Sequence, residues 1–576
     1  LDWNKFVVGK VVTDDIDSET FDAKRIEKQI GYAAHLGLPV ILFESPVTHV
    51  GITQLARVIN SKVSASVGMN MAQMWIQIAI SSPVEQALST RNDQIKLEDD
   101  KCTNDEGALR EEFVSDPWQQ WNMFRSLINL DRRVGIALEL NGDLPDQEVL
   151  SRWGGEPVKC IVIPTSMFMT NRKGYPVLSR SYQQFIHFLV DKMARDVQFI
   201  VKGLNKHSDI MHYAQYLEHI RAMQLPTDSV SRFARGYEDY LQIPLQPLMD
   251  NLESCTYEIF EKDPVKYKEY QNAIFEAMKT IETENELIVM VVGAGRGPLV
   301  RATLAAAESL SRKVHIYAVE KNPYAIVTLK HIRETDWGGN KGTPFGYVEV
   351  IDSDMRDWVC PRKADIVVSE LLGSFGDNEL SPECLDGVWK CVKKETISIP
   401  QSYTSYLAPI MSHKVYSEAS ALKEREKPSY TPFEWSYVVH LKNCYLIDKP
   451  KPLFTFEHTE LHKPPSEKDN SRYLSLTFKP SLDCICHGFA GYFETTLFGN
   501  IKLGTVHGNH TPGMFSWFPI YFPLHNPINI QKNQNIKVHF WRLINKRAVW
   551  YEWCLTQPQP TAIHNPNGRS HPIGLL

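Results

Sequence analysis

Two glutamates, Glu370 and Glu379, have the residue type and spacing that could do chemistry in this sequence. Glu370 ends an apolar run, and a loop containing Gly373 leads to Glu379 nine residues later. A loop that doubles back can bring both carboxylates to one pocket, where they could grip a planar guanidinium group through charge-assisted, bidentate hydrogen bonds. The alternative, a capping or surface pair ahead of a helix that starts at Ser381, fits the spacing equally well.

Such a grip would have a defined effect on a guanidinium group. The group stays protonated in water because its pKa is above about 12. Paired carboxylates would polarise it, localise a lone pair on one nitrogen and orient that nitrogen towards an electrophile, which is the proximity contribution to rate. This interpretation requires a site for the electrophile beside the two glutamates.

A glycine-rich turn from Gly293 to Gly297 is the candidate for that second site. It follows the buried-looking run Glu286–Val292 and opens the helical stretch Leu299–Leu310. Glycine lets the backbone approach a ligand closely, and a helix N-terminus favours negative charge. Sites for NAD, FAD and S-adenosylmethionine all use such turns, and some such turns bind nothing, so the turn alone does not identify a cofactor.

Acidic residues in the next two strand regions narrow the choice of cofactor. Glu320 closes a strand-like run 25 residues beyond Gly295, where a carboxylate can accept hydrogen bonds from ribose hydroxyls. An ion pair with Lys321 is the alternative. Asp354 and Met355 follow in the third region, where a polar acceptor beside methionine suits the exocyclic amine and ring face of adenine. For that segment the alternative is a solvated acidic loop.

The segment Cys484-Ile-Cys486-His487 is the best candidate for a metal site. Its two cysteines share one face of a predicted strand, and small buried cysteines are common in protein cores. No second ligand pair stands at zinc spacing, so we expect no metal. The ten cysteines of the chain form no dense framework, which favours reduced thiols in a cytosolic or nuclear setting.

The first 225 or so residues alternate between apolar runs and amphipathic stretches. Six or more strand–helix units in a row favour a closed, TIM-type β/α barrel over an open doubly wound sheet. Strand ends such as Leu42-Phe43-Glu44 and Ile163-Pro164-Thr165 show no paired acids, so we expect a docking role and no catalysis. The apolar runs are Phe6–Val12, Pro39–Glu44, Met74–Ile80, Val134–Leu140, Lys159–Pro164 and Val197–Gly203.

Two further domains should follow this barrel. A connector with Pro244 and Pro247 leads to the helical stretch Lys266–Lys279 and to strands that flank the glycine turn, as in a Rossmann-like α/β domain. After Pro400, alternating stretches indicate antiparallel strands, and Ser417–Lys427 indicates a charged helical arm. The predicted antiparallel strands are Tyr403–Ile410, Tyr437–Leu441, Arg472–Phe478, Ile501–Val506, Ile536–Trp541 and Val549–Cys554. We therefore expect domains at residues 1–235, 236–400 and 401–576.

Length and composition agree with a multidomain globular protein. At 576 residues the chain is too long for one core, and 43% hydrophobic with 23% charged residues is ordinary for a soluble protein. The formal charge of −6 argues against a dedicated nucleic-acid binder, which normally has a basic face. No apolar run reaches membrane-spanning length. Because the chain reads almost at once into a strand-like run, we expect residues to be missing before Leu1.

Several motifs in order resemble the protein arginine methyltransferases, and look closest to their symmetric-dimethylating (type II) members. The motifs are Gly293-Ala-Gly-Arg-Gly-Pro298, Ser369-Glu370-Leu-Leu-Gly-Ser-Phe375 and Asp377-Asn-Glu379. The resemblance is dense from Gly236 to the C-terminus, including Thr511-Pro-Gly-Met-Phe-Ser-Trp-Phe-Pro519, and looser before it. In two places the sequence departs from the family pattern: Gly376 stands where alanine is expected, and the stretch Glu334–Val350 fits poorly.

The resemblance implies roles for individual residues. Glu370 and Glu379 would form a double-glutamate clamp on the arginine, and Phe260 matches an aromatic position that accompanies symmetric dimethylation. Phe515-Ser516-Trp517 would wall the arginine tunnel, with Ser516 and Trp517 contacting the substrate. The residues implied to contact S-adenosyl-L-methionine are Tyr257, Lys266, Tyr267, Gly293, Gly295, Glu320, Asp354 and Met355.

The resemblance also implies a cellular setting. Substrates would be arginine-containing proteins such as histone tails and spliceosomal or other Gly/Arg-rich RNA-binding proteins, without direct binding of nucleic acid or membrane. A WD-repeat adaptor would dock on the N-terminal barrel, and the C-terminal β-barrel would bind substrate and dimerise. The assembly would be a homo-oligomer or a hetero-octamer in the cytoplasm and nucleus.

Two rival readings belong to other classes. An NAD- or flavin-dependent enzyme would use the same glycine turn but would give the paired glutamates no role. A catalytically dead scaffold would be expected to lack Glu370 or Glu379, and both are present.

Overall fold

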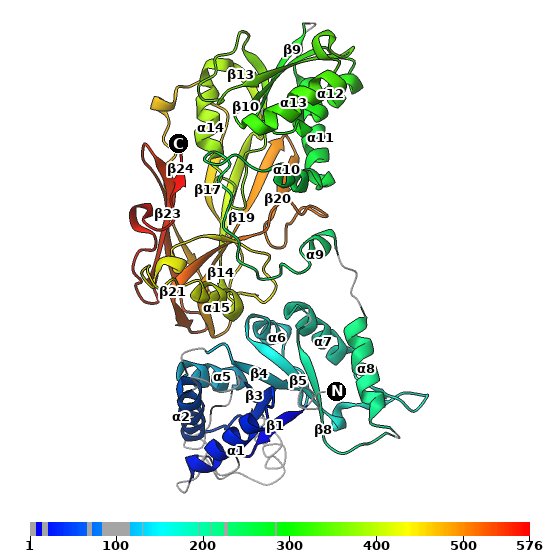
Figure 1. The fold of residues 1–576 in the computed structure, drawn as a ribbon, viewed down its shortest axis with the longest axis vertical. Helices are drawn as coiled ribbons and strands as arrows, with labels where there is room; N and C mark the ends of the chain where they lie inside the picture. The colour runs from blue at the N-terminus through cyan, green and yellow to red at the C-terminus, as the bar shows by residue number, and fades with distance from the viewer. Residues whose placement is uncertain are drawn as a thin grey trace, which may run out of the picture. The chain divides into compact units, whose positions relative to one another are not determined.

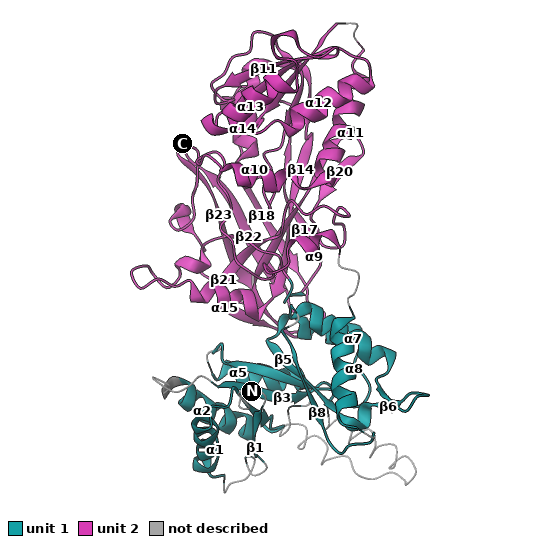
Figure 2. Ribbon diagram, turned by 45° about the vertical axis from the view of Figure 1, so that its right-hand side comes forward, with its two compact units in different colours: residues 1–226, 442–445 teal, residues 227–441, 446–576 magenta. Residues whose placement is uncertain are grey.

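The computed structural model describes residues 7–13, 16, 21–65, 72–82, 114, 116–128, 131–194, 196–207, 209–223, 228–282 and 285–576. The chain divides into two compact units (Figure 2). Unit 1 comprises residues 1–226 and 442–445, and unit 2 comprises residues 227–441 and 446–576. Each unit has its own buried hydrophobic cluster, so the two are described separately.

Unit 1 is built on one parallel sheet with strand order β1-β2-β3-β4-β5-β8. The strands of this sheet follow the order of the chain, with only the separate hairpin of β6 (Met169–Thr170) and β7 (Pro176–Val177) between β5 and β8. Helices alternate with the strands (Figure 1), which confirms the β/α pattern predicted from sequence. Phe6, the start of the first predicted run, lies outside the described residues. The strands are β1 (Val8–Val11), β2 (Val40–Glu44), β3 (Gln73–Ala79), β4 (Val134–Glu139), β5 (Val158–Pro164) and β8 (Gln198–Lys202). The main helices are α1 (Ala23–His35), α2 (His49–Ala65), α5 (Pro117–Ser126), α6 (Gln147–Arg152), α7 (Arg180–Lys192) and α8 (Met211–Ala222).

The strand ends of unit 1 carry paired acids, so the prediction that they do not was wrong. Lys202 Nζ lies 3.4 Å from Glu44 Oε1 and 3.2 Å from Glu139 Oε1. Lys10 Nζ lies 2.8 Å from the same Glu44 oxygen. The two acids lie on β2 and β4, which β3 separates, so spacing along the chain did not reveal the cluster. Each carboxylate has a lysine partner, and the lysines lower the pKa of Glu44 although burial acts to raise it.

Unit 2 contains a second parallel sheet with strand order β11-β10-β9-β12-β13. The order reverses beside β9, and open α/β sheets bind ligands at the carboxyl ends of strands at such a reversal. The strands are β9 (Leu287–Val292), β10 (Val314–Glu320), β11 (Gly346–Asp352), β12 (Ala364–Ser369) and β13 (Val392–Ile399). The helices are α9 (Ser229–Phe233), α10 (Ser254–Glu261), α11 (Pro264–Thr280), α12 (Pro298–Ser309), α13 (Pro323–Thr335) and α14 (Ser381–Gly387).

Antiparallel strands make up the rest of unit 2. In the larger sheet β15, β21, β19 and β14 are neighbours, while β17 pairs with β14 and β20 with β19. The smaller sheet has the order β18-β22-β23-β24. Their bounds are β14 (Ser402–Met411), β15 (Tyr437–Val438), β17 (Lys451–Glu457), β18 (Arg472–Phe478), β19 (Cys484–Phe498), β20 (Ile501–Gly504), β21 (Ile520–Ile530), β22 (Ile536–Ile544), β23 (Ala548–Gln557) and β24 (Ile573–Gly574).

Sequence alternation did not reveal the full extent of these strands, although Cys484 and Cys486 at the start of β19 were placed on a strand. The central strand β19 is buried on both faces along most of its length, so polar and apolar residues do not alternate in it. Strand β21 contains Pro523 and Pro527, which read as interruptions. The predicted helix Ser417–Lys427 was wrong in its bounds, because Ser412 caps the helix earlier and α15 runs from His413 to Ala421.

Candidate active site

The turn after β9 lines a cavity and is built from glycines. Gly293 and Gly295 have φ angles of 69° and 54°, in the left-handed region. A Cβ at Gly293 would lie 2.8 Å from Leu371 Cδ2, and one at Gly295 would lie 3.0 Å from the Tyr257 ring. Both positions therefore require glycine. The N–H of Gly295 donates to Glu320 Oε2 at 2.7 Å, so the turn and Glu320 meet.

Glu320 is a buried carboxylate bound by backbone N–H groups. Its Oε1 accepts from the N–H groups of Lys321 (2.9 Å) and Asn322 (2.7 Å). Burial raises the pKa of Glu320 despite these hydrogen bonds. Beside it, burial and the Glu320 charge raise the pKa of Tyr257 to about 12, and the Tyr257 hydroxyl accepts from Asn322 Nδ2 at 3.1 Å. The Lys321 contact with Glu320 is thus made through the backbone.

Asp354 is held by the arginine two residues after it. Its Oδ1 accepts from the backbone N–H (2.8 Å) and Nε (3.0 Å) of Arg356, and its Oδ2 accepts from Nη2 (2.8 Å). Burial acts to raise the pKa of Asp354, but the hydrogen bonds and charge of Arg356 outweigh burial and lower it. Asp354 and Met355 line the same cavity as the glycine turn. The acidic segment is therefore folded against the site.

Glu370 follows the last residue of β12, and Glu379 stands at the far end of the loop that begins there. We call residues 370–379 the clamp loop. Both carboxylates line the same cavity. Leu380, and not Glu379, occupies the N-cap position of α14. Burial, together with the nearby Glu370 charge, raises the pKa of Glu379 well above its ordinary value. Two carboxylates that face one cavity form a strong site for a cationic group.

Lys266 lies closer to the clamp than its implied role as a cofactor contact suggests. Its Nζ is 3.0 Å from Glu370 Oε2, and its side chain is 1% exposed. The ammonium also lies 4.9 Å from the ring centroids of Tyr267 and Trp517 and 5.5 Å from that of Phe260. Burial acts to lower the pKa of Lys266, but Glu370 outweighs it and the pKa is raised. The cavity therefore already surrounds one cation with a carboxylate and aromatic rings.

Asp263 is a site residue that the sequence interpretation missed. It is fully buried, and its Oδ1 accepts from the backbone N–H groups of Val265 and Lys266 at the start of α11. Its Oδ2 accepts from the N–H groups of Phe515 and Ser516 and from the Ser516 hydroxyl, each at 2.8 Å. The Asp-Pro pair that opens a helix is a recognisable capping signal. The contact of Asp263 with Phe515, however, spans 252 residues and leaves no such local signal. The hydrogen bonds of Ser516 to Asp263 thus hold the loop that contains Ser516 against the start of α11.

Trp517 connects that loop to the clamp loop. Its indole Nε1 donates to the carbonyl oxygen of Leu372 at 2.8 Å, and its ring is edge-on to Phe493. The two loops are therefore joined by a buried hydrogen bond as well as by their shared cavity.

One cavity of about 600 Å³ collects every site residue predicted from sequence. All of its lining residues belong to unit 2. The predicted residues that line it are Tyr257, Phe260, Lys266, Tyr267, Gly293, Gly295, Glu320, Asp354, Met355, Glu370, Glu379, Ser516 and Trp517.

No group of three or more His, Cys, Asp or Glu side chains among the described residues is arranged to hold a metal ion. Cys484 and Cys486 are buried cysteines on β19. Within the same part of the chain, no helix combines the length and apolar character needed to cross a membrane.

Family models match three consecutive segments of the chain. The PRMT5 TIM barrel domain matches residues 1–223, the PRMT5 arginine-N-methyltransferase domain matches 228–399, and the PRMT5 oligomerisation domain matches 402–573. The TIM-type barrel, methyltransferase domain and C-terminal β domain expected from sequence agree with these matches.

Curated relatives match over nearly the full length. The chain is 44% identical to protein arginine N-methyltransferase 5 of Xenopus laevis, with 100% of this chain and 89% of the relative covered. It is 39% identical to the protein of the same name from Oryza sativa subsp. japonica, with the same coverage of both chains. It is 37% identical to protein arginine N-methyltransferase skb1 of Schizosaccharomyces pombe, covering 96% and 87%. With two carboxylates facing one cavity beside a glycine turn, these matches show that the chain belongs to the PRMT5 family of protein arginine N-methyltransferases.

Proposed function

We propose that Glu370 and Glu379 bind the guanidinium group of a protein arginine, and that S-adenosylmethionine is the methyl donor. One observation carries the proposal: both carboxylates share a cavity with the glycine turn and Glu320, at the carboxyl edge of the parallel sheet. Ligands of open α/β sheets bind at this edge, where the strand order reverses. Arginine N-methylation, the activity of the family, needs an arginine site and a donor site side by side.

The residues around the glycine turn fit this donor. Gly293 and Gly295 line the cavity in a turn that requires glycine, and Glu320 offers a carboxylate for ribose hydroxyls. When bound, S-adenosylmethionine supplies an electrophilic methyl group on a sulfonium sulfur. The residues that we assign to its binding are Tyr257, Lys266, Tyr267, Gly293, Gly295, Glu320, Asp354 and Met355.

The two glutamates orient the arginine for in-line attack. Each carboxylate can accept two N–H groups from one edge of the guanidinium, which leaves one terminal nitrogen facing the donor. Burial strengthens these contacts because the local dielectric is low. After the nitrogen–methyl bond forms and the sulfur–methyl bond breaks, the methylated group releases one N–H proton. Glu379, whose pKa is raised, can accept that proton.

Glu320→Ala should weaken binding of S-adenosylmethionine by about 5- to 150-fold. The substitution removes acceptors for ribose hydroxyls, and losing such hydrogen bonds costs about 1–3 kcal/mol. Isothermal titration calorimetry measures the change, with Glu349→Ala on the neighbouring strand β11 as the matched control. Tight binding of NAD with no response to S-adenosylmethionine would refute the assignment of the donor.

We also propose that the product is monomethylarginine and symmetric dimethylarginine, and that Phe260 shapes this outcome. Symmetric product requires the pocket to hold a methyl group on the far nitrogen while the near nitrogen is free. Phe260 lines the cavity, and its ring is 5.5 Å from the cation of Lys266. A flat ring here can bound the space and stack on the guanidinium plane.

Phe260→Met should add asymmetric dimethylarginine to the products. A flexible methionine presents a different wall and lets the methylated nitrogen react again. Mass spectrometry of peptide digests separates the two dimethyl forms. The control is Phe275→Met on α11, a position that does not belong to the cavity lining among the described residues. Unchanged product ratios in Phe260→Met would show that Phe260 only packs against its neighbours and does not determine the product.

The resemblance to the family extends the proposal to partners. We propose histone tails and spliceosomal or other Gly/Arg-rich RNA-binding proteins as substrates, and a WD-repeat adaptor docked on the N-terminal barrel in a hetero-octamer of the cytoplasm and nucleus. The match to the oligomerisation domain supports self-association. Sedimentation of the chain alone and mixed with a WD-repeat protein measures both associations, and a monomer in both runs would contradict them.

A further inference from the structure

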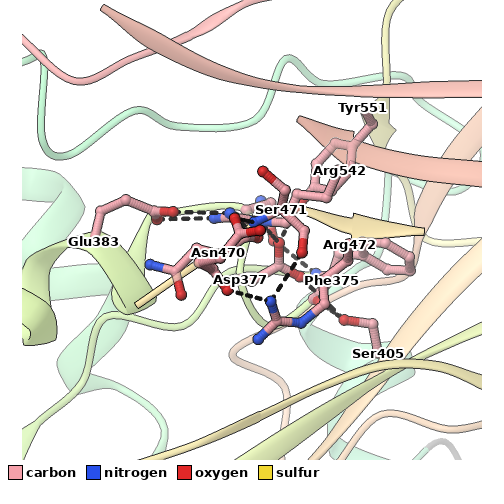
Figure 3. A network of polar contacts seen from close by, with 11 residues as sticks. Phe375, Asp377, Glu383, Ser405, Asn470, Ser471, Arg472, Arg542 and Tyr551 are labelled. Carbon is pink, nitrogen blue, oxygen red and sulfur yellow. Dashed lines mark hydrogen bonds and ion pairs between the residues drawn. The ribbon is translucent and has the colours of Figure 1, made fainter. Parts of the chain in front are cut away.

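A buried charge network anchors the clamp loop (Figure 3). Asp377 lies two residues before Glu379 and is fully buried. Its Oδ2 accepts from Arg542 Nε and from the Tyr551 hydroxyl, both at 2.6 Å. The Ser405 hydroxyl donates to the carbonyl oxygen of Phe375 at 2.7 Å and lies 3.1 Å from Asp377 Oδ1. These partners come from β14, β22 and β23 of the antiparallel sheets.

Arg542 holds the chain on both sides of Glu379. Its Nε contacts Asp377, before Glu379 in the sequence. Its Nη1 and Nη2 donate to Glu383 Oε1 and Oε2, both at 2.8 Å, in the helix α14 that follows Glu379. A third contact runs from Nη1 to the carbonyl oxygen of Asn470 at 3.0 Å. One guanidinium group on β22 thus fixes the chain on both sides of Glu379.

The charges of this network are removed from solvent. The side chains of Arg542 and Asp377 are 0% exposed, and that of Glu383 is 7% exposed. Buried ion pairs are often no more stabilising than apolar residues of similar volume, because desolvation offsets their attraction. Their defined hydrogen-bond directions fix geometry well. We therefore expect these three charges to contribute little to the stability of the fold. Their main effect is to fix the geometry of the clamp loop.

We propose that Arg542 and Asp377 are positioning residues for arginine methylation: they set the place of Glu379 relative to Glu370. Neither side chain is among the residues lining the cavity in the described part of the chain, so they act through the loop. The inference rests on the proposed role of Glu379 as an arginine-binding carboxylate. It makes the C-terminal sheets part of the catalytic geometry, because Arg542 and Tyr551 lie 165 and 174 residues from Asp377.

Arg542→Lys and Asp377→Asn test the proposal in the full chain. A lysine cannot bridge Asp377 and Glu383 at once, and asparagine keeps the shape of Asp377 without its charge. Each variant should lower kcat for an arginine peptide by about 10- to 100-fold, the effect of a misplacement near 1 Å. The dissociation constant for S-adenosylmethionine should stay within about twofold of the parent, because the donor residues lie on other elements.

A double-mutant cycle separates positioning from a general loss of structure. If Arg542 acts through Glu379, Arg542→Lys should lower kcat no further in a Glu379→Gln background, measured with a radiolabelled donor. The control is Arg569→Lys, because Arg569, in the segment between β23 and β24, also pairs with a buried glutamate, Glu434. That control should keep parental kcat.

Each result has one meaning for the proposal. Unchanged kcat in both network variants would overturn it, as would losses that add to that of Glu379→Gln. Loss of donor binding in both variants would also overturn it, since the network would then support the whole fold and not the loop. If Glu379→Gln alone keeps parental kcat, the proposed function itself fails, whatever the network variants do.

Discussion

Glutamine in place of Glu370 or Glu379 is expected to lower kcat for an arginine peptide by about two to four orders of magnitude. A neutral amide cannot reproduce a charged bidentate acceptor. Removing one member of a buried charge pair costs about 2–5 kcal/mol, and each 1.4 kcal/mol is about a factor of ten in rate. Donor affinity should change less than kcat, because both side chains act on the substrate; the change should be larger in Glu370→Gln, since Glu370 also pairs with Lys266.

Steady-state kinetics and donor calorimetry on the two variants check this expectation. Glu395→Gln, at an exposed position of β13, is the matched control and should keep parental kcat. Near-parental turnover in Glu370→Gln or Glu379→Gln would assign that residue a structural role. The raised pKa of Glu379 adds a pH signature. An ordinary glutamate takes up its proton near pH 4.3. As pH falls, Glu379 takes up its proton at a higher pH than this, so kcat/KM should begin to fall above about pH 4.3.

Glu156→Ala is expected to destabilise unit 1 by about 3–5 kcal/mol, the cost of breaking a buried ion pair by removing one partner. Glu156 is fully buried and accepts from the indole nitrogens of Trp118 (2.8 Å) and Trp121 (2.9 Å). Its Oε2 also pairs with Arg125 Nη1 at 2.6 Å, and the Arg125 side chain is 1% exposed. The substitution removes the carboxylate that pairs with this buried guanidinium and accepts from both indoles.

Denaturant unfolding of the full chain measures this loss. The earliest transition should move to lower denaturant in Glu156→Ala, while Glu218→Ala, at an exposed position of α8, should leave it in place. The cavity is lined only by unit 2, so donor affinity under native conditions should be retained. An unchanged first transition would mean that the Arg125 charge finds another partner or water.

Elements with local signals could be predicted from the sequence. The strands β9, β10 and β12 are continuous apolar runs, and their polar ends marked Glu320 and Glu370 as site candidates. Carboxyl ends of neighbouring parallel strands meet at one edge, so local patterns were enough to bring these residues together. The prediction of the clamp pair needed only nine residues of chain and a loop.

Contacts between distant segments could not be predicted in this way. Asp377 reads as one acid in a polar loop, and its ion pair with Arg542 spans 165 residues. Asp263 reads as a helix cap, and its contact with Ser516 spans 253 residues. The salt-bridge cluster of unit 1 joins strands that are not adjacent. In each case pairing depends on how sheets close in space, which periodicity along the chain does not encode. The predicted domain limits at residues 235 and 400 stay predictions.

The most direct test of the account is transfer of a labelled methyl group to arginine. The chain is incubated with methyl-labelled S-adenosylmethionine and a Gly/Arg-rich peptide, beside the same peptide with lysine in place of each arginine. Mass spectrometry should place the label on arginine nitrogens of the first peptide only, and Glu379→Gln should abolish nearly all of it while still binding the donor. Label on the lysine peptide, or full transfer by Glu379→Gln, would contradict the central claim that paired glutamates bind an arginine beside the methyl donor.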